Sequence, residues 1–202
     1  TGRSAWIRLF DETSAALRFP FKKKLLTEAE ILNLLSDADP KTRKIAGKAL
    51  SEILRNNKRI FGMILNVISR DRFIEDNKRG FKRIMSSRNL DNDVEDEVVD
   101  KLVNTVDKAM PKLTHRYYKW KANQFGQAKL DWWDRNAPLN HSERTLIKWD
   151  DAKNIVLEAF NDFNPKISNI AKQFFDNNWI DAEPRKGKAS GAFAHPSVPS
   201  HH

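Results

Sequence analysis

The sequence predicts a mainly α-helical protein, a bundle of long antiparallel helices with a few short strands. Hydrophobic residues make up 40% of its 202 residues, enough to bury a core, and it holds only seven Gly and eight Pro. Two long stretches, 41–69 and 94–120, carry apolar residues at the spacing of one helix face. No fixed period of about 34 or 40 residues recurs, so the sequence disfavours a repeat array.

The first predicted element is a helix over residues 4–17, where apolar side chains recur at helical spacing. Pro20 ends this helix, because proline lacks a backbone donor and restricts the residue before it. A short extended or hairpin segment is expected to follow, through Leu26. Thr27 and Glu30 then form a capping box, in which each side chain accepts a hydrogen bond from the other's backbone N–H, and a short helix begins there.

The turn at Asp37–Pro40 is expected to cap a long helix over residues 41–69. The residues expected to face the core from this helix are Ile45, Ala49, Leu50, Ile53, Ile60, Phe61, Ile64 and Ile68. A separate helix is predicted over 72–85, followed by a loop over 86–92.

A second long helical pattern runs over residues 94–120. It keeps its period through Pro111, so the pattern leaves open one kinked helix or two abutting helices. Two further helices are expected over 149–163 and 165–177, separated by an Asn-Pro pair.

The aromatic stretch over residues 130–138 lies before these last two helices and is too short to be a helix face. We expect Trp132 and Trp133 to be buried and to anchor it. Asp134 and Arg135 are expected to pair with each other or with neighbouring backbone. The stretch therefore reads as a connector between two helical parts.

The composition limits the function classes. Lys and Arg outnumber Asp and Glu by 36 to 27, but they are scattered, and only Lys22–Lys24 and Arg185–Lys188 form small clusters. This distribution favours solvated helix faces over a nucleic-acid interface. The absence of Cys excludes disulfides and thiol nucleophiles. No apolar run of about 18 residues and no signal-peptide pattern occur, so we expect a soluble protein without a membrane partner. The absence of Cys fits a reducing cytoplasm, which is the location we expect.

The residues by themselves name no reaction. His115 has no second His three or four positions away, so a helical pair of metal ligands cannot form there. The other histidines are expected in a polar loop or in the last stretch of the chain: His141, His195, His201 and His202. Helix capping accounts for the acidic run Asp93–Asp100. We therefore predict no catalytic residue and no metal ligand in this chain.

Several motifs nevertheless match a known family in order and spacing. They are His115–Tyr118, Trp133–Leu139, Trp179–Lys188 and Ser190–Phe193, with further likeness at 2–6 and 27–46. Together they resemble the oligoendopeptidase F branch of the thimet-type (M3) zinc peptidases, over most of the chain.

The resemblance implies a nearly all-helical enzyme with a deep channel that hydrolyses oligopeptides. In that family the zinc ion is held by a His-Glu-x-x-His helix and by a glutamate on a second helix, and the motif glutamate is the general base. Neither element is found in this sequence. The resemblance therefore implies a segment that ends before the zinc helix, binds no zinc itself and is inactive alone.

The resemblance also implies a division of the chain and a substrate site. Residues 1–134 would be a helical lobe segment, 135–148 a connector, and 149–202 the start of the catalytic domain, with an edge strand at 188–194. The residues expected to pair with the backbone of a substrate peptide are Ser190, Gly191, Ala192 and Phe193. An exposed strand edge can bind an extended peptide whatever its side chains, and Gly191 would allow close approach.

A different class of function stays open at this point. The chain could be a basic helical interaction module without enzymatic activity, binding RNA or protein. Binding to nucleic acid would then weaken steeply between low and moderate salt, because bound cations are released from the phosphates.

Overall fold

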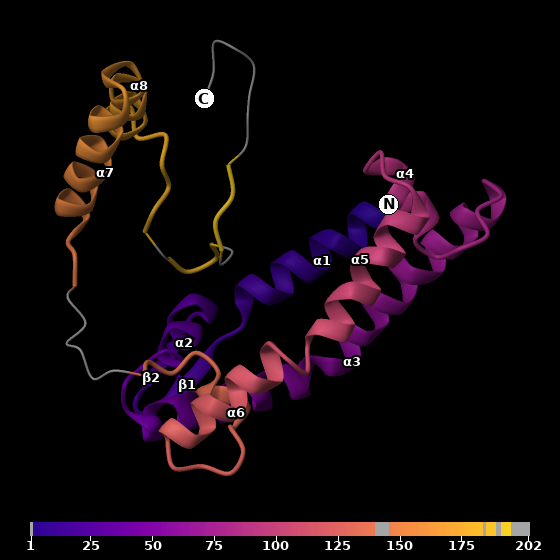
Figure 1. Ribbon diagram of the computed structural model, residues 1–202, viewed down its shortest axis with the longest axis horizontal. Helices are drawn as coiled ribbons and strands as arrows, with labels where there is room; N and C mark the ends of the chain where they lie inside the picture. Colours follow the sequence, from indigo (N-terminus) through magenta and orange to yellow (C-terminus); the bar gives the residue numbers. More distant parts are fainter. Residues whose placement is uncertain (1, 140–145, 184, 189–190, 195–202) are drawn as a thin grey trace. The chain divides into compact units, whose positions relative to one another are not determined.

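The computed structural model describes residues 2–139, 146–183, 185–188 and 191–194 (Figure 1). The chain forms two compact units. The first unit comprises Thr1–Leu139 and Lys186–Ala189, and the second unit comprises Asn140–Arg185 and Ser190–His202. The helices and strands of the first unit are α1 (Arg3–Ala16), β1 (Phe19–Phe21), β2 (Lys24–Leu26), α2 (Glu28–Leu34), α3 (Pro40–Lys78), α4 (Ser86–Asp91), α5 (Asp96–Ala109), α6 (Thr114–Gln124) and the short 3-10 helix η1 (Trp132–Asp134). The second unit contains α7 (Trp149–Phe163) and α8 (Pro165–Asp176). The mainly helical fold is thus confirmed.

The segment before α2 is the hairpin that the sequence left as one of two alternatives. β1 and β2 pair antiparallel, with Phe19 opposite Leu26. The capping box is also confirmed: the Thr27 N–H donates to Glu30 at 2.7 Å, and the Glu30 N–H donates to the Thr27 hydroxyl at 3.4 Å. These bonds cap the N-terminus of α2 directly after the hairpin.

The long helix α3 begins as expected but continues further. Asp39 caps it by accepting hydrogen bonds from the N–H groups of Lys41 and Thr42, at 3.0 and 3.1 Å. It runs to Lys78, because residues 70–78 contain no Gly or Pro that would break it. Gly80, with a φ of +78°, ends it in a left-handed turn.

Two sequence predictions around this helix end are therefore wrong. Residues 72–78 belong to α3 rather than to a separate helix over 72–85, and α4 occupies most of the predicted loop over 86–92. α4 is stabilised by a tertiary contact, since the Asn89 side chain donates to Asp96 at 2.7 Å. Such a partner outside the segment is invisible to a local pattern.

Around Pro111 the structure selects two abutting helices. α5 ends at Ala109 and α6 begins at Thr114, with Pro111 in the turn between them. In the second unit, Asn164 ends α7 and caps α8, where its side chain accepts from the Lys166 N–H at 2.9 Å. The two helices expected at 149–163 and 165–177 are thus confirmed.

The core of the first unit lies where the hairpin, α2 and the first half of α3 meet. Its buried residues are Phe19, Ile31, Leu35, Ala46, Ala49 and Leu50. Ala49, Leu50 and Ile64 of the predicted stripe are buried, but Ile45 is 45% exposed. The buried face instead includes Arg43, Ala46 and Gly47, so it is rotated from the one expected. No helix within the described residues is both long and apolar enough to cross a membrane.

Candidate functional site

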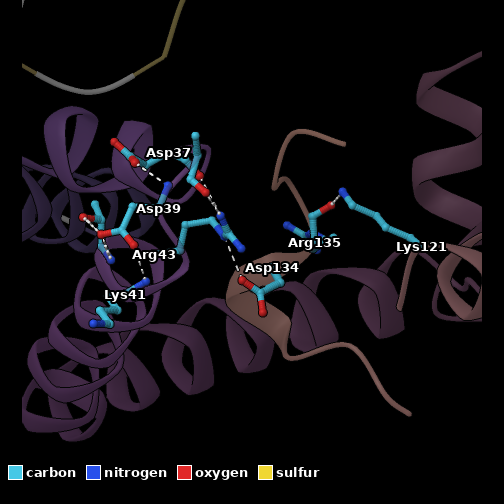
Figure 2. Close-up of polar contacts among 9 residues, drawn as sticks. Asp37, Asp39, Lys41, Arg43, Lys121, Asp134 and Arg135 are labelled. Atoms are coloured by element: carbon cyan, nitrogen blue, oxygen red, sulfur yellow. Dashed lines mark hydrogen bonds and ion pairs between the residues drawn. The ribbon is translucent and has the colours of Figure 1, made fainter. Parts of the chain in front are cut away.

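A buried ion pair fixes η1 to α3. Arg43 of α3 donates from Nε to Oδ1 of Asp134 at 2.7 Å, and each side chain is only 3% exposed. The Nη1 atom of Arg43 also donates to the carbonyl oxygens of Asp37 and Ala38, at 2.8 and 2.9 Å (Figure 2). The guanidinium group therefore has both a charge partner and neutral acceptors, which a buried charge requires.

The prediction for Asp134 was wrong, because its partner is neither Arg135 nor neighbouring backbone. Arg43 lies 91 residues earlier in the chain. We call the contacts of Arg43, Gly47, Lys121, Trp133 and Asp134 the connector dock. These contacts hold η1, which follows α6 in the chain, against the first half of α3.

A glycine makes the close approach of the dock feasible. A Cβ atom on Gly47 would lie 2.9 Å from the Cβ of Trp133 and 3.2 Å from the ring of Trp132. Trp133 is partly buried against the core, whereas Trp132 is 49% exposed. The expectation that both tryptophans are buried is therefore wrong for Trp132.

Lys121 of α6 completes the dock. Its ammonium group donates to the carbonyl oxygen of Arg135 at 2.6 Å (Figure 2). Burial of the side chain lowers the pKa of Lys121, and the nearby positive charge of Arg43 lowers it further, while Asp134 acts in the opposite direction. The charged form of this lysine is therefore disfavoured in the folded state.

This lowered pKa predicts that stability rises with pH in the alkaline range. The folded state binds fewer protons than the unfolded state between the lowered pKa and the ordinary value of about 10.4, so the cost of the charged form disappears as pH rises through that window. We expect the stability of the native chain relative to Lys121→Met, from urea unfolding, to rise as the pH increases towards about 10.4, the ordinary pKa of lysine. A flat difference across this range would contradict a lowered pKa.

The predicted substrate-pairing residues are far from the dock in sequence, and the structure describes them only in part. Ser190 lies outside the described residues. Gly191 has a φ of +101°, nothing lies within 4 Å of the position of a Cβ on it, and Phe193 is 90% exposed. The predicted strand over 188–194 is not formed at its described residues, Lys188 and Gly191–Ala194. A strand requires a hydrogen-bonded neighbour, and local sequence cannot supply one.

The described residues also offer no metal site. No group of three or more His, Cys, Asp or Glu side chains in this part of the chain is placed to hold an ion. His115 lies exposed on α6, and the other four histidines lie outside the described residues. The described residues therefore bring together no set of ligands of the kind that a zinc ion requires.

Comparison with known proteins shows which family this chain resembles in sequence and in fold. The model of peptidase family M3 matches residues 33–202. A crystal structure from Bacillus anthracis str. Ames, described as an oligoendopeptidase F, shares the fold with a TM-score of 0.82 at 19% identity, over 94% of this chain and 36% of that one. Oligopeptidase PepF of Bacillus subtilis (strain 168) is 25% identical over 85% of this chain and 26% of its own length. An oligoendopeptidase F homolog of Borreliella burgdorferi is 25% identical over 90% of this chain and 31% of its own length.

These matches show the class of protein to which the chain belongs: it is a helical part of a peptidase fold. The family match covers well over half of the residues, and the chain belongs to peptidase family M3. It spans about a quarter to a third of the length of the curated relatives it matches. The resemblance inferred from the sequence motifs is thereby confirmed.

Proposed function

We propose that this chain is part of a cytoplasmic, zinc-dependent endopeptidase that hydrolyses oligopeptides. The observation that carries the proposal is the match to peptidase family M3 over residues 33–202. Similarity to oligopeptidase PepF supports oligopeptides, rather than nucleic acid, as the binding partners. In this proposal residues 1–134 form a helical lobe and channel wall, 135–148 the connector, and 149–202 the beginning of the catalytic domain.

The zinc ion belongs to polypeptide outside these residues. The sequence contains no His-Glu-x-x-His motif, and zinc bound by such a motif activates water and polarises the peptide carbonyl. The role of this chain is to bind and align the substrate. On its own it is inactive and takes up no stoichiometric zinc.

Substrate alignment is assigned to Ser190, Gly191, Ala192 and Phe193. The exposure of Phe193 and the open space around Gly191 support this assignment, because both leave backbone groups accessible to a peptide. Pairing through N–H and C=O groups is independent of the side chains of the peptide, which suits a peptidase that accepts many sequences.

Proline substitutions test this assignment in the longer protein that contains this chain and a His-Glu-x-x-His helix. Backbone N–H groups of adjacent residues in a strand point to opposite sides, and proline has none. We expect one of Ala192→Pro and Phe193→Pro, but not both, to lower kcat/KM for a quenched fluorescent peptide about fivefold or more, since each hydrogen bond contributes about 1 kcal/mol.

The controls keep the N–H group and change only the side chain. Ala192→Val and Phe193→Leu should stay within about twofold of the native kcat/KM if backbone pairing dominates. Equal losses for both proline variants, or no loss for either, would remove the pairing role. The 202-residue chain assayed alone should show neither cleavage nor bound zinc, and an inactive longer protein with zinc supplied would contradict the proposed function itself.

A further inference from the structure

Within the first unit, a continuous apolar stripe on α5 is left uncovered. Within α5 and the turn residue after it, the stripe consists of Val98, Leu102, Val103, Val106 and Met110, which are between 41% and 62% exposed. Over Asp96–Ala109, all of which is described, no residue of α5 is buried. Val98 and Leu102 also line a shallow hollow, together with Glu97, Lys101 and Thr105.

The polar side of α5 is fixed, by contrast. Arg83 pairs with Asp100 at 2.7 Å and with Asp96 at 3.5 Å, and the Asn89 side chain donates to Asp96 at 2.7 Å. These contacts hold the beginning of the helix in place. A helix of about 14 residues is marginal in water without packing of its apolar face, so the stripe is positioned but not yet covered.

We propose that the α5 stripe packs against polypeptide of the same protein that lies outside residues 1–202. This inference rests on the proposed function, in which the chain is part of a longer peptidase. The Bacillus anthracis structure contains this fold, at a TM-score of 0.82, as 36% of its chain, and the curated relatives are matched over 26% and 31% of theirs. About two-thirds of such a polypeptide is therefore available to cover the stripe, and an apolar stripe of this length calls for a covering partner.

Amide hydrogen exchange in the 202-residue chain and in the longer protein tests this docking. We expect α5 amides to exchange at least about tenfold more slowly in the longer protein, because packing suppresses local opening. Leu102→Glu should abolish that protection there, since a buried carboxylate has no partner. In the 202-residue chain the same variant should keep its helical content and its exchange rates, because Leu102 is 62% exposed.

Asn104→Glu is the matched control. Asn104 lies two residues further along α5, about 200° around the helix from Leu102, and should leave α5 exchange unchanged in both proteins. Equal α5 exchange in the two native proteins would overturn the inference. The inference would also be overturned if the 202-residue chain formed a concentration-dependent dimer in which α5 is protected, and if Leu102→Glu dissociated that dimer. Because peptide cleavage is no part of the readout, the inference can fail while the longer protein still cleaves peptides.

Discussion

Asp134→Asn is expected to lower the free energy of unfolding of the first unit by about 3–5 kcal/mol, because it leaves the charge of Arg43 buried without its partner. Both side chains are only 3% exposed, so water cannot replace the lost carboxylate. Urea unfolding followed by tryptophan fluorescence measures the change, since Trp132 and Trp133 adjoin the pair.

Two controls separate burial from charge pairing in general. Arg8 and Glu12 on α1 form an ion pair of similar length, 2.9 Å, but with side chains 81% and 67% exposed. Glu12→Gln should therefore cost less than about 1 kcal/mol. The double variant Arg43→Met with Asp134→Leu should cost less than Asp134→Asn, because no uncompensated charge remains. If Asp134→Asn costs no more than Glu12→Gln, the buried pair does not stabilise the dock.

Features whose causes lie within a few residues were predictable from the sequence. The Thr27–Glu30 capping box and the two Pro-started helices, α3 and α8, depend on side chains up to three positions from the helix start. The C-terminal end of α3 was misplaced although its signal, Gly80 after a stretch without breakers, was present. The predicted helix ended at residue 69 instead, and a second predicted helix over 72–85 ran through that glycine.

The connector dock was not predictable in the same way, since its partners are distant in sequence. One signal was nevertheless present. Arg43 lies three and seven positions before Ala46 and Leu50, so a charged residue occupies a position on the buried stripe. A buried arginine requires an acidic partner, and Asp134 beside two tryptophans was a candidate for that role. The site at Ser190–Phe193 rests on family motifs, because no local pattern distinguishes a substrate-pairing strand from any other exposed segment.

Gly47→Ala is expected to destabilise the dock although alanine is the better helix former. The new Cβ would lie 2.9 Å from the Cβ of Trp133, well inside van der Waals contact, and that atom is too close to the backbone to move freely. Overpacking of this kind costs roughly 1–3 kcal/mol, and the helix propensity of alanine offsets about 1 kcal/mol of it. We expect a net loss of roughly 1–2 kcal/mol in urea unfolding.

Gly62 in the same helix supplies the opposite case. No atom lies within 4 Å of the position of a Cβ there, so Gly62→Ala should raise stability by roughly 0.5–1 kcal/mol through helix propensity alone. The two glycines differ only in what faces them. If Gly47→Ala lowers the free energy of unfolding and Gly62→Ala raises it, the loss at Gly47 comes from the close contact of Trp133 with α3. A stabilising Gly47→Ala would instead mean that η1 does not pack against α3 at this distance.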